Sequence, residues 1–225
     1  MDLTLKAFED NTRAVVPGFR VAWKTDSTTQ KILGRLLWFN PGYMTEYVST
    51  FYPVVYYLSK ENYESKPLNS LAVIAHERVY LLDTAKSGFW FRFSYLLPQI
   101  LLVPLLLSSI MCLFFTWKLA VVLFVIGLLS VIPWPSSWRT HWEKRGYAMS
   151  MAVFYWVNGE VHDGLKKLIR DNFLGMAYFK MSWSPKDIDQ WITSTVSDIE
   201  SGALSKDPIY GAVYQFLLDQ GLVKQ

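Results

Sequence analysis

A long apolar stretch near the middle of the chain limits the folds that it can adopt. Residues 93–117 contain no charge across 25 positions, and after Lys118 a second charge-free run covers residues 119–138. A helix rises about 1.5 Å per residue, so roughly 20 apolar residues cross the ~30 Å hydrocarbon core of a bilayer. Residues 93–135 are therefore predicted to form a transmembrane helical hairpin. A hairpin buried inside a water-soluble core is the less favoured alternative.

Basic residues beside the predicted hairpin indicate its orientation. Arg92 precedes it and Arg139, Lys144 and Arg145 follow it, whereas only Lys118 lies at the predicted turn. Lys and Arg are enriched on the cytoplasmic side of membrane proteins. The sequence therefore predicts an integral membrane protein with both flanks in the cytoplasm and the lipid bilayer as a partner.

Composition excludes some classes of function. Charged residues make up 18% of the 225 positions, below the roughly 25% of an average soluble domain. The net charge of +3 is too small to indicate a nucleic-acid partner. Cys112 is the one cysteine, so neither an internal disulfide nor a cysteine-based zinc motif is expected. The first residues lack an apolar stretch, so no cleavable signal peptide is predicted.

The apolar run divides the chain into three predicted segments. Residues 1–92 form an amino-terminal segment with a strand region and a helix that carries a His-Glu motif. Residues 93–135 are the transmembrane hairpin. Residues 136–225 form a helical carboxy-terminal segment. The predicted fold class is therefore mostly α with a small β element.

Local signals place the elements inside the two flanks. The stretch YVSTFYPVVYYLS is rich in β-branched and aromatic residues around Pro53, which is typical of an edge strand or a bent strand pair. A helix is predicted to begin near Pro67 and to end at Ser87-Gly88. Another helix is predicted from about Ser136 to Val157, ahead of Asn158-Gly159.

A His-Glu pair gives the strongest chemical signal. In the segment AHERVYLLD, His76 and Glu77 occupy the first two positions of the pattern His-Glu-x-x-His. The two His of that pattern lie one helical turn apart and bind one zinc ion, while the Glu polarises the metal-bound water. Here Tyr80 stands at the second His position. A lone His-Glu pair on a helix is common, so the motif by itself does not establish a metal site.

Longer blocks around this motif carry a resemblance. The chain contains WFNPGYMTEYVSTFYPVVYYL, AHERVYLLD, SYLLPQI and IPWPSSWRTHWEKRGYAMSMAVFYWV, which together span about residues 38–157. These blocks resemble a group of phage and bacterial membrane proteins that look like gluzincin zinc metallopeptidases, in which a later Glu completes the HExxH site. The resemblance implies a zincin-like core interrupted by the hairpin. It also implies a phage-encoded protein in the inner membrane of a bacterial host.

The resemblance further implies the members of a site. His76, Tyr80 and Glu143 would hold zinc and Glu77 would be the catalytic base. Glu143 follows the hairpin, whose ends return together, so it is predicted to lie close to His76 although it comes 67 residues later. Asp83 is expected either to orient His76 or to act as a substitute ligand. Because a phenol titrates near ~10, zinc is expected to bind weakly or not at all.

Three functions are compatible with these patterns. The first is a degenerate zinc-metallopeptidase-like membrane protein that is weakly active or inactive on peptides. The second is a non-catalytic membrane scaffold or partner-binding protein in phage infection, virion assembly or entry. The third, less favoured, is a holin-like membrane permeabiliser. The sequence identifies neither a peptide substrate nor a protein partner.

Overall fold

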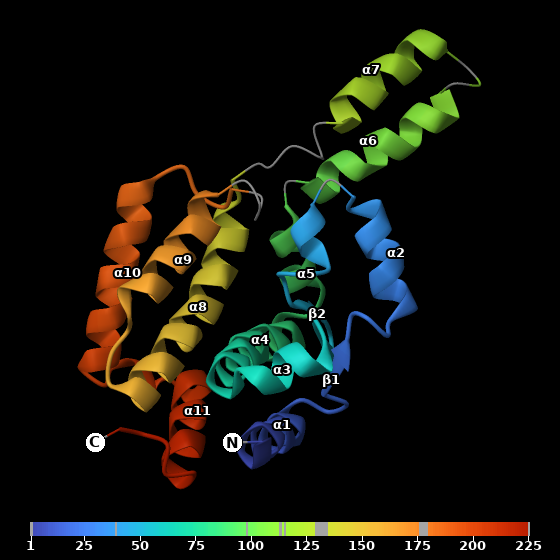
Figure 1. Cartoon of the computed structure of the whole chain (residues 1–225). Coiled ribbons are helices and arrows are strands. Elements are labelled where there is room, and N and C mark those ends of the chain that lie inside the picture. The colour runs from blue at the N-terminus through green and yellow to red at the C-terminus, as the bar shows by residue number, and fades with distance from the viewer. Residues whose placement is uncertain are drawn as a thin grey trace.

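The computed structural model describes residues 2–38, 40–97, 99–112, 114, 116–128, 135–175 and 180–224. The α-helices, coloured along the chain in Figure 1, are α1 Asp2–Val15, α2 Thr28–Leu36, α3 Lys60–Ser65, α4 Pro67–Ser87, α5 Phe89–Leu96, α6 Gln99–Cys112, α7 Trp117–Leu128, α8 Ser137–Asn158, α9 Asp163–Leu174, α10 Pro185–Glu200 and α11 Pro208–Asp219. Short 3-10 turns are η1 Pro41–Tyr43 and η4 Leu204–Lys206, and the strands are β1 Arg20–Trp23, β2 Ser49–Phe51 and β3 Val54–Tyr57.

The two long helices α4 and α8 form the centre of the fold. Pro67 opens α4, where its missing N–H costs no helical hydrogen bond, and Gly88 with φ +52° ends it. The Ser136 side chain caps α8 by accepting a hydrogen bond from the Arg139 N–H, and Gly159 ends the helix in the left-handed region. The helices pack against each other along much of their length. Side chains on their facing sides therefore meet although the apolar stretch separates them in sequence.

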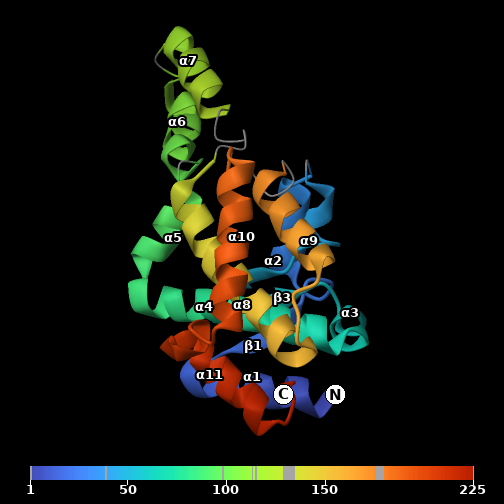
Figure 2. The ribbon, with the colours of Figure 1, turned by 90° about the vertical axis from the view of Figure 1, so that its left-hand side faces the viewer.

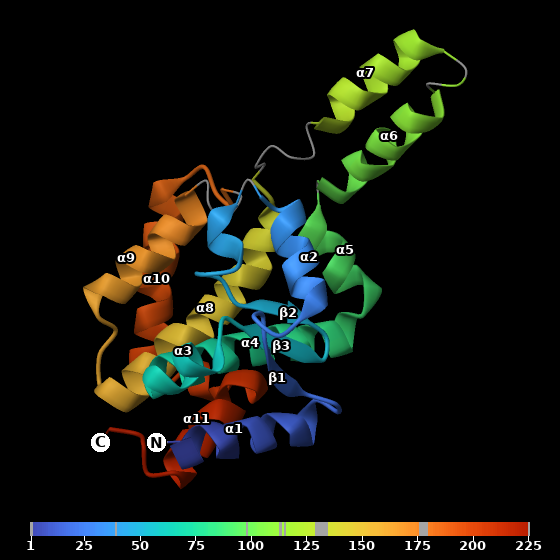
Figure 3. The same ribbon diagram turned by 45° about the vertical axis from the view of Figure 1, so that its right-hand side comes forward.

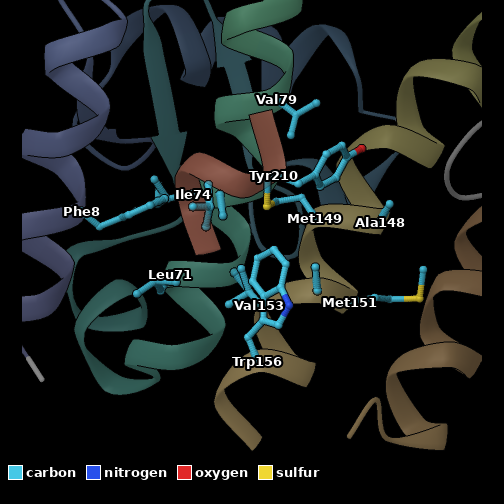
Figure 4. Packing of buried hydrophobic residues seen from close by; sticks show 14 of the residues in the cluster. Phe8, Leu71, Ile74, Val79, Ala148, Met149, Met151, Val153, Trp156 and Tyr210 are labelled. Atoms are coloured by element: carbon cyan, nitrogen blue, oxygen red, sulfur yellow. The ribbon is translucent and has the colours of Figure 1, made fainter. Parts of the chain in front are cut away.

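A shared apolar core fixes this pair of helices in place. Figure 4 shows Ile74 of α4 beside Met149 and Val153 of α8, with Phe8 of α1 and Tyr210 of α11 in the same cluster. All five side chains are buried. Helices from both ends of the chain thus close over the α4–α8 pair, as Figure 2 also shows. Because the core is packed on several sides, polar groups that project from α4 toward α8 have little freedom to move.

The small sheet covers one side of α4. Its strand order is β1-β3-β2, with β1 parallel and β2 antiparallel to the central strand β3. β2 also contacts α4, so this edge strand lies next to the helix that carries the His-Glu pair. The strand pair expected around Pro53 is present as β2 and β3. The first strand, β1, was not predicted.

The apolar stretch does not form the predicted transmembrane hairpin. It is divided among α5, which packs on the body, and α6 and α7, which project together from it (Figure 3). α6 has 14 residues and α7 has 12, which correspond to about 21 Å and 18 Å of helix, short of the ~30 Å hydrocarbon core. Among the described residues no helix has both the length and the apolar character needed to cross a bilayer. Positions 98, 113, 115 and 129–134 of the predicted hairpin lie outside the described residues.

This finding corrects three predictions at once. The fold is mostly helical with a small sheet, but the described residues form no transmembrane hairpin. The predicted integral membrane protein and its predicted place in a bacterial inner membrane with two cytoplasmic flanks are both wrong on the same ground. The physical reason is that the helix is interrupted at residue 97 and again after α6. These interruptions divide a stretch that is continuously apolar in the sequence into short helices.

Candidate functional site

His76 lies on the side of α4 that faces α8, and its imidazole lies directly against the α8 backbone. A Cβ atom on Gly146 would come within 2.5 Å of His76 Nε2 and 2.7 Å of Cε1. Real Cβ contacts are never so short, so only a glycine at this position leaves room for the ring. The His76 ring packs edge-to-face against the Tyr80 ring and against the Tyr147 ring, with a centroid distance of 4.8 Å in each pair. The imidazole is therefore held on several sides.

The hydrogen bonds of His76 use both ring nitrogens. Nε2 lies 2.8 Å from the Tyr80 hydroxyl one turn along α4, and Nδ1 lies 3.3 Å from the Ser150 hydroxyl on α8. Burial lowers the pKa of His76 to about 3, because the charged imidazolium would lose its hydration. His76 is therefore neutral near pH 7, so one nitrogen donates and the other accepts.

Glu143 is brought to the same place from α8. Its Oε2 lies 3.9 Å from His76 Nε2, so the predicted proximity of these two residues is confirmed. Because His76 is neutral, this contact is not an ion pair. The Tyr95 hydroxyl of α5 donates to Glu143 Oε1, and the Tyr80 hydroxyl interacts with the same carboxyl group. Burial raises the pKa of Glu143, while these two phenols and the Arg139 guanidinium oppose the rise.

Glu77, next to His76 on α4, faces the sheet. The Thr50 hydroxyl of β2 donates to Glu77 Oε2 over 2.6 Å. The pKa of Glu77 is raised to about 8, chiefly by burial. The Thr50 hydrogen bond opposes this rise, and the nearby Glu143 carboxyl contributes to it. Lys24, buried just after β1, has the smallest effect and lowers the pKa. A carboxyl group with a pKa near neutrality can exchange a proton under ordinary conditions.

Asp83 lies away from this cluster. Its two carboxylate oxygens accept hydrogen bonds from Arg145 Nε at 2.9 Å and from Arg145 Nη2 at 3.0 Å. This two-pronged ion pair between α4 and α8 satisfies both groups. The structure therefore brings His76, Glu77, Tyr80 and Glu143 together and places Asp83 in a contact that fastens the two helices.

A cavity of about 460 Å³ opens onto these side chains. Its polar floor consists of His76, Glu77, Tyr80 and Glu143. The walls come from the edge strand and from α4 and α5: Val48, Ser49, Thr50, Phe51, Tyr52, Thr84, Phe91, Arg92, Tyr95 and Leu96. Four groups that could bind or transfer a proton thus meet at the base of a largely apolar, partly open cavity.

Some members of the site were not singled out from the sequence. Gly146 and Ser150 follow Glu143 by three and seven residues, so all three lie on one face of a helix, and this spacing is a signal that could have identified them. Thr50 and Tyr95 carry no comparable signal. They reach the site because β2 and α5 pack beside α4.

The residues present do not fit a zinc ion as they are arranged. The Nε2 atom that would bind the metal is hydrogen-bonded to Tyr80, and the Glu143 carboxyl group already interacts with two phenols. Within the described part of the chain, no group of three or more His, Cys, Asp or Glu side chains is placed to hold a metal ion. The expectation of a metallopeptidase-like donor set is corrected accordingly.

Replacing Gly146 with Ala is expected to destabilise the protein by about 1–3 kcal/mol, because the new methyl group must displace the His76 ring from a packed position. Urea unfolding would measure the change. Gly164→Ala is the matched control, since that glycine lies in α9 with open space where the methyl group would project, and the better helix former should stabilise it. Equal stability of the Gly146→Ala and native proteins would contradict the close packing.

Comparison with known proteins identifies no relative: no protein-family model, no curated protein and no solved structure matches the chain.

Proposed function

We propose that the cavity binds an extended segment of polypeptide, which adds to the sheet beside β2. The proposal is supported by the lining of the cavity: residues 48–52, which include all of β2, line it together with His76, Glu77, Tyr80 and Glu143. Within the described part of the chain, β2 pairs with β3 alone and is an edge strand. The unpaired backbone groups of an edge strand are a template on which another strand can pair.

The other walls suit the side chains of such a segment. Phe51, Phe91 and Leu96 present apolar surface, and side chains along an extended strand alternate between two faces. Apolar side chains of one face would enter the cavity while those of the other face stay in solvent. A segment that alternates apolar and polar residues therefore fits better than a uniformly polar one.

A second candidate function is proton transfer to the bound segment. Glu77 lines the cavity, and its pKa of about 8 lets it give or accept a proton near neutral pH. Thr50, which belongs to the proposed docking strand, orients the Glu77 carboxyl group by its 2.6 Å hydrogen bond. This arrangement would place Glu77 beside the backbone of a segment paired to β2. Hydrolysis of a bound peptide, lost in Glu77→Gln while binding persists, would support this candidate.

The binding proposal is tested with fluorescent, acetylated and amidated heptapeptides in which Leu or Phe alternates with Thr. Fluorescence anisotropy would measure their dissociation constants with the full-length protein. In an antiparallel pairing only every second amide of the peptide points toward β2. N-methylation of one alternate set should therefore abolish binding, and N-methylation of the other set should leave it within about threefold.

Variants of the protein complete this test. Phe51→Ala should weaken binding at least tenfold, because Phe51 lines the cavity, whereas Phe89→Ala removes an exposed ring that does not line it and should have little effect. Equal binding by both N-methylated sets would contradict strand pairing. Failure of every peptide to bind at millimolar concentration would contradict the peptide as ligand.

A further inference from the structure

The paired helices α6 and α7 form the second unusual feature of the molecule. They pack on each other and project from the body as a finger in all three overall views (Figures 1, 2 and 3). The sequence of α6 contains no charged residue, and α7 contains only Lys118, which lies near the tip of the finger. The cavity and its polar floor lie in the body, so the finger needs an explanation of its own.

The described residues of the finger that are buried are all small, and many of its large apolar residues are exposed. Ser109 of α6 and Ala120 and Gly127 of α7 are buried. By contrast Leu107, Ile110 and Val125 are 61%, 57% and 56% exposed. In water the hydrophobic effect favours the reverse arrangement. Small residues at the contact with large apolar residues facing outward are typical of helices that pack together within lipid.

The exposed apolar surface extends around most of α7. Val121, Val122, Phe124, Val125 and Ile126 are each between 39% and 56% exposed. At 100° per residue these positions cover more than half of the helix circumference. A second copy of the chain would cover one face of the finger and leave the rest in water. A surrounding apolar medium covers all of it.

Aromatic residues gather where the finger leaves the body. Trp138 near the start of α8 is 44% exposed and packs edge-on to Trp90 at 5.7 Å. Trp38 and Trp183 are 81% and 65% exposed, and the segments that carry them, after α2 and before α10, lie at the same end of the body (Figures 1 and 3). Lys180 lies 3.7 Å above the Trp183 ring. Exposed Trp favours the boundary between hydrocarbon and water, where a neighbouring Lys can keep its charged end in water.

We propose that the α6–α7 finger lies within one leaflet of a lipid surface without crossing it, tilted so that the Lys118 ammonium group reaches the headgroups, with Trp38, Trp138 and Trp183 at the headgroup level. Each leaflet contributes about 15 Å of hydrocarbon, so helices of about 21 Å and 18 Å can enter at a tilt. The inference rests on the packing of the finger and is independent of the ligand of the cavity.

The experiment uses the full-length protein and large vesicles of phosphatidylcholine. A Cys112→Ser, Phe124→Cys protein carries an environment-sensitive fluorophore on the exposed face of α7, and a Cys112→Ser, Asp198→Cys protein carries it on exposed α10. Vesicles should blue-shift the α7 probe, and spin-labelled lipids should quench it, while the α10 probe should not respond. A water-exposed α7 probe in protein that floats with vesicles would overturn the proposal.

A matched pair of substitutions distinguishes insertion of the finger into lipid from nonspecific adsorption of the protein to vesicles. Val125 on α7 and Leu168 on α9 are each 56% exposed. Val125→Asp should lower the vesicle partition coefficient at least tenfold, whereas Leu168→Asp should leave it within about twofold. Equal effects of the two substitutions would overturn the proposal. So would a lipid-free dimer, measured by sedimentation, that Val125→Asp dissociates, because the finger would then be covered by a second copy.

Discussion

Tyr80→His is expected to raise the zinc affinity of the protein on the order of 100-fold, equivalent to about 2.7 kcal/mol. The Tyr80 hydroxyl lies 2.8 Å from His76 Nε2 and also interacts with Glu143, so it fills the space between the two groups that could bind a metal. An imidazole is shorter than a phenol and would vacate part of that space. It would also supply a nitrogen one helical turn from His76.

Three features of the site affect the size of this gain. His76 is already neutral, so zinc would not have to displace a proton from it near pH 7. The pKa of Glu143 is raised by burial, and a carboxyl group that holds its proton more tightly opposes metal binding. His76 Nε2 and Glu143 Oε2, now 3.9 Å apart, would have to approach by about half an ångström to share an ion tetrahedrally.

Titration calorimetry and bound-metal analysis of the native protein and three variants would measure the gain. Tyr80→Phe removes the hydroxyl without adding a nitrogen and should remain close to the native affinity. Tyr80→His combined with Glu143→Ala should lose most of the gain, because the carboxylate ligand is missing. A similar gain in Tyr80→Phe would mean that clearing the space matters more than the new ligand. Stoichiometric, tightly held zinc in the native protein would show that Tyr80 itself serves as a ligand.

The sequence predicted the elements whose ends carry strong local signals. Pro67 and Gly88 delimit α4, Gly159 ends α8, and Pro53 separates two short strands, all close to the predicted positions. β1 was missed because four residues within a mixed, polar region give no recognisable pattern. The apolar stretch was misread for the opposite reason: its composition is uniform, and composition does not reveal where helices break or which of them packs on the body.

Helix periodicity predicts which residues of the site lie on the same face of one helix, but not which residues approach from other elements. Spacing on α4 places His76 and Tyr80 one turn apart, and their 2.8 Å contact agrees with this. The approach of Glu143 followed from the expectation that the ends of the apolar stretch return together. The roles of Thr50 and Tyr95 depend on which strand and which helix lie beside α4, and Asp83 is held by Arg145 from the opposite helix. Such partners are set by tertiary packing, which no local pattern encodes.

The free energy of unfolding is expected to fall by about 2 kcal/mol as the pH rises from about 6.5 to about 8, because Glu77 must then ionise in a buried position. The pKa of Glu77 is about 8 in the folded protein and 4.5 is its ordinary value. Between these values the folded state binds a proton that the unfolded state has lost, so stability declines by about 1.4 kcal/mol per pH unit. His76 acts in the opposite sense between about pH 3 and 6.5, where only the unfolded state binds its proton.

The effects of Glu77 and His76 cancel between about pH 4.5 and 6.5. Because burial also raises the pKa of Glu143, a shallow decline is expected in that range and a steeper one above it. Lys24, with a pKa lowered to about 8 by burial, contributes only at higher pH. Urea unfolding at four values from pH 6.5 to 8 would measure the slope. Glu77→Gln, which keeps a hydrogen-bonding group but cannot ionise, should remove the slope, and Glu61→Gln at an exposed position of α3 should preserve it. A flat profile for the native protein, or an unchanged slope in Glu77→Gln, would show that Glu77 is not the group that ionises in this range.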